Sequence, residues 1–474
     1  MIYSLLILVT FSRALIPAIA AWAATPPDSQ QFGPSIDIAA QRGPAIFNSV
    51  HDTLRKWGSI VHPNGMSMFL ATEDGRAKDY SFDGFDTTWQ HMAPLEGSQE
   101  QVQLADDGDD RHGWLHTYRT SRPLRFLYLD GLSGNKGHDG VTDTQEFLLR
   151  ESKDADPRRR DVLLEEDRPP GPPGEYEMVL EVCSLLVRWH LDGMIRTEWA
   201  GFEIVKCDFP NGLEQVQAVQ RADKPDGWEP PPRHRPGDGH DGDHYSDRPG
   251  EEPGPGWPRT CTTCDLDASR TLVDYSSMLS AYFFPVSLAN PASNDSSLPR
   301  LVNTTADERT TIRECLGRVV KQRLGLTPAQ FGWRDVADLV VRRYASALSA
   351  LATATATATA TTTTPTQDVQ QRIDYLLQVF IDHADAEDVR DSEAVKRCTR
   401  FYLHSIPLQT ETDQLIYAAF EAVNNNICTT LFHAQHLLAS SSNEDNKQNT
   451  LLRIHDSIQS LIKYLSWSAF ESDK

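Results

Sequence analysis

The feature that most constrains this chain is a long stretch that cannot enter a protein core. Residues 223–258 consist mainly of Pro, Gly, Asp, His and Arg, and almost the only apolar side chains are Trp228 and Trp257. Such a segment cannot bury enough apolar surface to offset the entropy lost on ordering. We therefore expect a disordered linker at 223–260 that divides the 474 residues into two domains.

The segment before this linker mixes helical and extended patterns. Apolar residues recur at helical spacing at 45–57 and at 175–191, whereas 124–129 and 202–209 are strand candidates. Strand, helix and strand in that order are typical of a βαβ unit. We expect an α/β or α+β domain at 43–222, with a long irregular acidic loop at 73–113.

The segment after the linker is dominated by helical periodicity, which predicts an all-α domain at 261–474. The expected helices are 265–282, 306–324, 333–351, 368–383, 392–406, 411–439 and 447–470. Between two of them lies a Thr/Ala low-complexity insertion, 352–364. We interpret it as a repeat expansion in a tolerant loop; the alternative is an O-glycosylated spacer.

The N-terminus has the pattern of a cleaved secretory signal at 1–23, followed by a polar tail at 24–42. There are two apolar stretches, 2–11 and 14–24; the second ends in small residues, and polar residues follow it at once. The alternative is a membrane anchor through residues 1–24, but Arg13 would then lie deep in the bilayer and Pro17 would interrupt the helix. We expect a secreted, extracellular protein without stable membrane insertion, unless this segment is retained.

Cysteines and glycosylation sequons favour the same compartment. The chain has seven cysteines, an odd number that leaves one free or intermolecular if the others form bridges. The disulfide candidates are a helix–strand pair and a C-x-x-C pair: Cys183, Cys207, Cys261 and Cys264. Asn294 and Asn303 begin Asn-x-Ser/Thr sequons in a polar segment and are glycosylation candidates.

Charge and missing motifs exclude several functions. Lys and Arg number 45 against 67 Asp and Glu, so the net charge is −22, which disfavours nucleic acid as a partner. Residues 238–244 (DGHDGDH) do not match a calcium loop, and no zinc ligand set is spaced correctly. We expect no metal and no cofactor. No nucleophile elbow, phosphate-binding loop or dinucleotide fingerprint occurs, so whether the chain is an enzyme stays open.

Three segments carry a resemblance: 46–71 (IFNSVHDTLRKWGSIVHPNGMSMFLA), 114–136 (WLHTYRTSRPLRFLYLDGLSGNK) and 189–213 (WHLDGMIRTEWAGFEIVKCDFPNGL). They resemble a group of uncharacterised secreted proteins of filamentous, ascomycete fungi. The resemblance implies a compartment and an architecture but no reaction. In such relatives the chain continues after Thr72 into a further extended segment, whereas here an acidic stretch follows at 73–86.

Two hypotheses of function follow. The first is an extracellular interaction or structural binding protein, whose partner is unknown and whose helical half is the binding module. The alternative is an extracellular enzyme using the α/β domain, remotely an ADP-ribosyltransferase-like transferase. In that case Arg119 would hold a phosphate, Tyr118 would stack on a ring, and Glu203 would stabilise positive charge.

Overall fold

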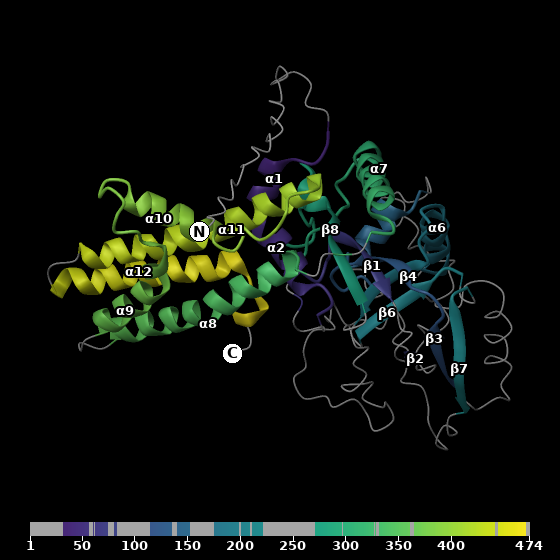
Figure 1. Ribbon diagram of the computed structural model, residues 1–474, viewed down its shortest axis with the longest axis horizontal. Helices are drawn as coiled ribbons and strands as arrows, with labels where there is room; N and C mark the ends of the chain where they lie inside the picture. Colours follow the sequence, from purple (N-terminus) through teal and green to yellow (C-terminus); the bar gives the residue numbers. More distant parts are fainter. Residues whose placement is uncertain are drawn as a thin grey trace, which may run out of the picture. The chain divides into compact units, whose positions relative to one another are not determined.

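The computed structural model describes most of the chain from residue 32 onward, and Gly33–Lys474 form one compact unit (Figure 1). The described residues are 32–55, 60, 62–73, 80–82, 114–134, 140–151, 175–198, 201–208, 211–220, 271–295, 297–326, 328, 331–360, 365–440 and 444–470. The expected signal at 1–23, the linker at 223–260 and the pair Cys261/Cys264 lie outside them.

A five-stranded sheet forms the centre of the first half, in the strand order β6-β5-β4-β1-β8. Its strands are β1 (Ser67–Glu73), β4 (Leu124–Leu129), β5 (Gly193–Glu198), β6 (Gly201–Lys206) and β8 (Thr271–Ser280). β4 and β5 pair in parallel, and the other neighbours pair antiparallel. A mixed α/β region is therefore present, as the sequence predicts.

The parallel pair is connected through α6 (Glu175–Arg188), which is the helix of the expected βαβ unit. Its buried face includes Met178, Val182 and Leu186. The strand that returns beside β4 is β5, which the sequence analysis missed, whereas the predicted strand at 202–209 corresponds to β6. β5 escaped notice because it buries Arg196 and Thr197, which give it no apolar alternation.

A second, three-stranded sheet has the antiparallel order β2-β3-β7. Its strands are β2 (Tyr80–Phe82), β3 (Trp114–Thr120) and β7 (Leu213–Gln220). The expected irregular loop at 73–113 therefore begins with the last residue of β1 and contains β2. Its other residues lie outside those described.

The predicted helix at 265–282 is wrong, because residues 271–280 form β8. β8 pairs with β1 at both of its ends, with Ser67 opposite Ser280 and Glu73 opposite Thr271, and the register shifts between Met68 and Leu70. Burial on successive residues at its end hides the alternation that marks a strand covered on one face only. A domain boundary near residue 261 would therefore separate β8 from the other four strands of its sheet.

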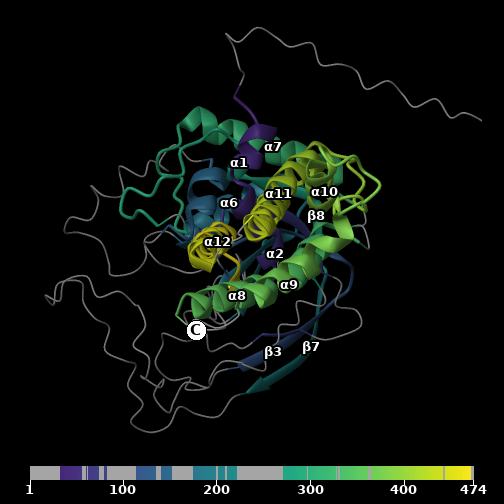
Figure 2. The same ribbon diagram turned by 90° about the vertical axis from the view of Figure 1, so that its left-hand side faces the viewer.

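The second half is mainly helical, as expected (Figure 2). Its helices are α7 (Ala306–Arg323), α8 (Trp333–Ala360), α9 (Pro365–Leu377), α10 (Arg390–Arg400), α11 (Glu411–Ala439) and α12 (Glu444–Leu465), with 3-10 turns η4 (Ala281–Phe283), η5 (Gln378–Phe380) and η6 (Ser468–Phe470). α11 packs against α9, α10 and α12, and α8 packs against α9 and α12.

Two helices from the start of the chain complete this bundle. α1 (Ile36–Gln41) and α2 (Gly43–Asp52) both pack against α11. Phe47 of α2 lies 4.6 Å from Phe420 and 5.7 Å from Trp467, ring centre to ring centre. Part of the tail expected at 24–42 is therefore helical. Ser35 caps α1 by accepting a hydrogen bond from the Ile38 N–H.

The Thr/Ala run is not a loop through residue 360, because α8 continues across it. Alanine has the highest helix propensity, and threonine can return its hydroxyl to the carbonyl four residues earlier. Buried Thr355 donates in this way to Leu351 O at 2.8 Å, and its Oγ1 lies 3.0 Å from His455 Nδ1 on α12. Residues 361–364 are not described.

Across the described ranges, none of the helices combines the length and the apolar character that a membrane crossing requires.

Candidate functional site

Polar side chains gather at one edge of the five-stranded sheet. β1 runs antiparallel to β4 and β8, and β5 runs parallel to β4, so β4, β5 and β8 all end at the edge where β1 begins. In sheets with parallel strands, ligands bind outside the carboxyl ends of those strands. The polar residues there, together with Asn48 and Ser49 of α2, form what we call the sheet-edge cluster: Asn48, Ser49, His62, Ser67, Asp130, Ser280 and Tyr282.

Asp130 is the carboxylate of the sheet-edge cluster and follows β4 directly. Its Oδ1 accepts a hydrogen bond from the Ser67 N–H at 2.8 Å. The residue is 6% exposed. Burial raises the pKa of Asp130 to about 7, against the opposing effect of hydrogen bonds from Ser67 and Ser49. A carboxyl group with this pKa changes its protonation near neutral pH.

Three buried hydroxyl groups lie beside this carboxyl group. Ser67 Oγ lies 3.0 Å from Ser49 Oγ and 2.9 Å from Ser280 Oγ. The three residues come from β1, α2 and β8, so the sheet-edge cluster depends on elements far apart in sequence. Hydroxyl groups both donate and accept, so this trio can adapt to either protonation state of Asp130.

The turn that precedes β1 places its backbone directly against Asp130. A Cβ atom on Gly65 would lie 2.0 Å from Asp130 O, closer than any side chain can approach. Gly131, which follows Asp130, has φ of +68°, a left-handed conformation suited to glycine. These two glycines allow the turn and the end of β4 to meet.

His62 presents an unpaired hydrogen-bond donor in the sheet-edge cluster. Asn48 Nδ2 faces Leu465 O at 3.0 Å and Ser466 O at 3.3 Å, which fixes this amide nitrogen as the donor. The same nitrogen lies 3.4 Å from His62 Nε2, which must then accept. Burial lowers the pKa of His62 and favours the neutral ring, so Nδ1 carries the remaining proton.

Three buried polar atoms of the cluster have no hydrogen-bond partner among the described residues: His62 Nδ1, Asn48 Oδ1 and Tyr282 Oη. The rings of His62 and Tyr282 lie 6.4 Å apart. Burial raises the pKa of the Tyr282 hydroxyl, and nearby Asp130 adds to this effect. Since buried polar groups are normally paired, these atoms are candidates for hydrogen bonds to water or to a ligand.

A second set of polar side chains extends the edge toward β5. Arg196 of β5 is fully buried, and its Nη1 donates to Gln145 Oε1 at 2.9 Å. Gln145 lies in the π-helical segment η2 (Thr144–Leu149) and donates through Nε2 to Ser133 O at 2.6 Å. Ser133 in turn donates to Leu129 O at 3.1 Å. This chain of hydrogen bonds fixes the segment after β4, where Asp130 lies.

The catalytic candidates from the sequence fall on two different sheets. Tyr118 and Arg119 lie on β3, where their Cα partners on β7 are Gln215 and Glu214. Glu203 lies on β6 of the five-stranded sheet, opposite Arg196. Their side chains are not among the described ones, so a shared pocket stays a prediction.

Two cysteine pairs are bonded in the described part of the chain. The sulfur atoms of Cys183 on α6 and Cys207 after β6 are 2.04 Å apart, the helix–strand pair named from the sequence. Cys398 and Cys428 join α10 to α11, a pair that the sequence analysis did not name. Among the described cysteines Cys315 is free, and it is buried.

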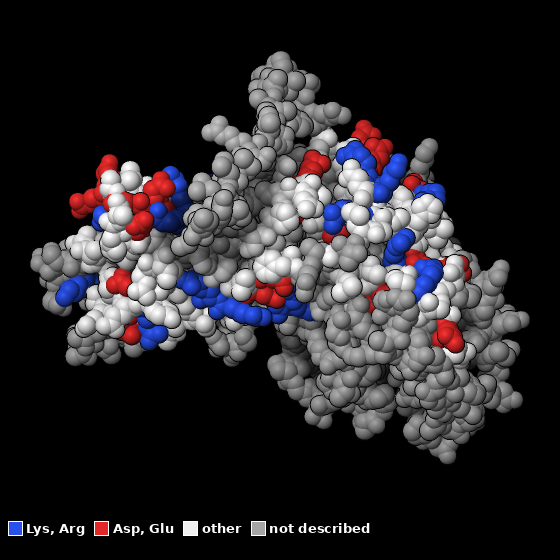
Figure 3. All heavy atoms as spheres, in the orientation of Figure 1, with Lys and Arg blue, Asp and Glu red and all other residues white. Residues whose placement is uncertain are grey.

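Both sequon asparagines are exposed in the segment between η4 and α7. Asn303 Nδ2 donates to Ala289 O at 3.0 Å. Charge on the visible face is mixed among the described residues (Figure 3). A row of basic side chains appears in the region of α8, whose sequence includes Arg334, Arg342 and Arg343.

The sequence analysis missed the sheet-edge cluster. His62 lies directly before 63–65 (PNG), and Asp130 lies directly after the strand predicted at 124–129. A usable signal was present, because both residues are polar and lie close to the ends of strands that could meet at one sheet edge. Ser280 and Tyr282 join this edge only through β8, and the residues of β8 are predicted as a helix from the sequence.

Comparison with known proteins relates part of the chain to uncharacterised fungal proteins. Residues 71–235 match the model of the YPL277C N-terminal domain. Two curated relatives of Saccharomyces cerevisiae, "Uncharacterized protein YPL277C" and "Uncharacterized protein YOR389W", are each 30% identical, over 228 and 227 residues. The matches cover 39% of this chain in both cases, and 44% and 34% of the relatives, so the chain spans less than half their length. No solved structure matches the chain.

These relatives have no named activity, so they supply no reaction. The matched residues 71–235 include Asp130 and Arg196 and end before β8.

Proposed function

We propose that this protein is a secreted, disulfide-stabilised binding protein that holds a small polar ligand at the sheet-edge cluster. The observation that carries the proposal is the set of unpartnered buried atoms on Asn48, His62 and Tyr282 beside Asp130. A ligand with both hydrogen-bond donors and acceptors would satisfy the His62 Nδ1–H, the Asn48 carbonyl and the Tyr282 hydroxyl together.

Secretion is supported by the two bonded cysteine pairs, because disulfides persist mainly in oxidising compartments. Exposed Asn294 and Asn303 are accessible for glycosylation. The pattern of residues 1–23, which is typical of a cleaved signal, supports the same proposal. Retention of residues 1–24 as a membrane anchor is the alternative.

One experiment tests both parts of the proposal. The full chain is expressed in a filamentous fungus and collected from the medium, and its intact mass gives the mature N-terminus and the attached glycans. The same material is screened by thermal shift against neutral sugars, amino acids, nucleosides and small carboxylic acids. Recovery only inside cells with residues 1–23 intact would overturn secretion.

Tyr282→Phe separates binding from folding. It removes a hydroxyl that has no hydrogen-bond partner among the described residues, so the ligand-free protein should keep its stability or gain about 1 kcal/mol. Affinity for the ligand found in the screen should fall about tenfold, or about 1.4 kcal/mol. Tyr344→Phe makes the same change at a buried tyrosine on α8 and should leave affinity unchanged. Equal affinity of both variants, or no ligand in the screen, would contradict the binding proposal.

An acid–base enzyme at the same cluster is the second candidate. It is favoured by Asp130, because a carboxyl group with a pKa of about 7 can accept and return a proton near neutral pH. If the bound ligand is consumed, its rate of turnover should follow a group that titrates near this pH, and Asp130→Asn should abolish that dependence. The transferase version with Tyr118, Arg119 and Glu203 predicts instead that substitutions on β3 stop turnover.

A further inference from the structure

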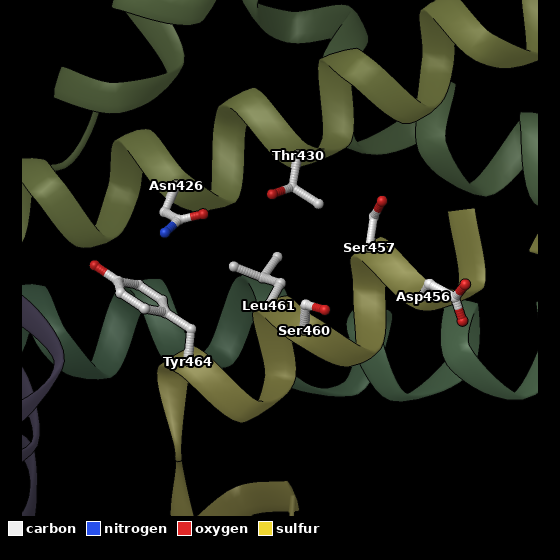
Figure 4. Close-up of a pocket in the computed structure, with 7 residues that line it drawn as sticks. All are labelled: Asn426, Thr430, Asp456, Ser457, Ser460, Leu461 and Tyr464. Atoms are coloured by element: carbon white, nitrogen blue, oxygen red, sulfur yellow. The ribbon is translucent and has the colours of Figure 1, made fainter. Parts of the chain in front are cut away.

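A second site lies in the helical half, in a groove of about 420 Å³ between α11 and α12 (Figure 4). Its volume falls within the range of about 300–1,000 Å³ that is typical of small-molecule sites. Asn426 and Thr430 of α11 line one side of the groove. The side chains from α12 are Asp456, Ser457, Ser460, Leu461 and Tyr464.

The groove exists because small polar side chains occupy the edge of the helix contact. The buried stripe of α12 consists of Leu451, Ile454, Ile458, Leu461 and Leu465. Beside this stripe, Ser457 and Ser460 stand where larger apolar residues would close the two helices together. The helices therefore pack along the stripe but leave a hollow beside it.

The lining side chains suit a particular kind of ligand. Tyr464 and Asn426 face each other at one end, and their hydrogen bond and the partial burial of the ring fix both in place. Thr430, Ser457 and Ser460 carry hydroxyl groups, and Asp456 is exposed and can accept further hydrogen bonds. The lining contains no basic side chain.

We propose that the groove between α11 and α12 binds a neutral polyhydroxylated ligand, a short oligosaccharide. An anion would be repelled by Asp456 and by the net charge of −22, and a purely apolar ligand would leave the hydroxyl and amide groups without partners. A sugar presents hydroxyl groups to these partners and an apolar face to the Tyr464 ring. The proposal goes beyond the sheet-edge cluster and does not depend on it.

The test uses the full secreted chain and the neutral probes cellotetraose, laminaritetraose and maltotetraose, titrated calorimetrically at millimolar concentration. At least one should bind, and anionic tetragalacturonate should not. Ser460→Trp would fill the groove from an exposed position, and Tyr464→Ala would remove the ring. Each should raise the Kd about tenfold or more.

Gln459→Trp is the matched control, because it adds the same side chain at the neighbouring exposed position of α12, outside the groove lining. It should leave the Kd unchanged, and thermal unfolding should show that all variants are folded. The proposal is overturned if no neutral probe binds, if tetragalacturonate binds as well as the neutral probes, or if Ser460→Trp and Gln459→Trp have the same Kd.

Discussion

For Asp130, the sequence predicts the position in the fold but not the partners of the side chain. The strand predicted at 124–129 is β4, which ends at Leu129, so Asp130 lies directly after it. Its role could not be predicted, because the partners Ser49, Ser67 and Ser280 belong to elements that only the tertiary fold brings together. A carboxyl group has an ordinary pKa until burial removes its solvent, and that burial is a property of the whole fold.

We predict that Asp130→Asn flattens the dependence of stability on pH. Burial raises the folded-state pKa from 3.8 to about 7, so between these values the folded protein holds this proton more tightly than the unfolded chain. The contribution of Asp130 to stability therefore falls as pH rises through this window and is lowest above it. Each tenfold difference in proton affinity corresponds to about 1.4 kcal/mol, so the effect should reach a few kcal/mol.

Urea unfolding of both proteins at about pH 4 and about pH 7 measures this difference. The wild-type chain should lose more stability between the two values than the Asp130→Asn variant. Parallel losses in the two proteins would show that the carboxyl group of Asp130 is not shifted by burial.

At the scale of elements, the sequence predicted helix α11 well but did not predict strand β8. α11 begins and ends where the sequence predicted, at Glu411 and Ala439, and Thr410 caps it through a reciprocal bond with Asp413. The residues of β8 are predicted as part of a helix at 265–282, and burial of its last four residues leaves no alternation there to correct this. Whether such a segment forms a strand depends on its contacts with neighbouring strands, and the local sequence pattern does not reveal those contacts.

The bond between Cys183 and Cys207 joins α6 to the end of β6, and we predict that removing it destabilises the chain. The two cysteines are 24 residues apart, and a cross-link closing a loop of this size contributes about 3 kcal/mol by restricting the unfolded chain. The double variant Cys183→Ala, Cys207→Ala should lose about that much unfolding free energy in urea.

Cys315→Ala is the control for this loss, because Cys315 is buried but forms no disulfide. Its loss should be smaller, about 1 kcal/mol. If the control and the double variant lose equal stability, packing rather than the cross-link accounts for the effect.

At the scale of the whole molecule, the sheet and the helical bundle do not correspond to two separate stretches of the chain. β8, which follows the expected linker, completes the sheet beside β1, while α1 and α2 pack into the helical bundle. Each half thus contains elements from the other side of residues 223–260. The sequence predicted both the sheet and the helices. It did not predict that β8 joins the sheet and that α2 joins the helical bundle, since nothing local in β8 or α2 specifies its distant partner.

We predict that cutting the chain within residues 223–258 does not separate the halves. A protease site inserted between Gly239 and His240 should be cleaved in the native protein, and the two fragments should elute together in size-exclusion chromatography. The β1–β8 pairing and the contacts of α2 with α11 should hold them. Denaturing electrophoresis confirms the cut, and elution of separate native fragments would contradict this arrangement of β8 and α2.

The place of β8 beside β1 also has a consequence for synthesis. The ribosome must add nearly two hundred residues after β1 before it reaches β8. At about 5–20 residues per second this takes roughly 10–40 s. During that time β1 has an open edge on the nascent chain, which can pair with other chains. Misfolding through this edge should therefore increase when the chain is synthesised more slowly or at higher concentration.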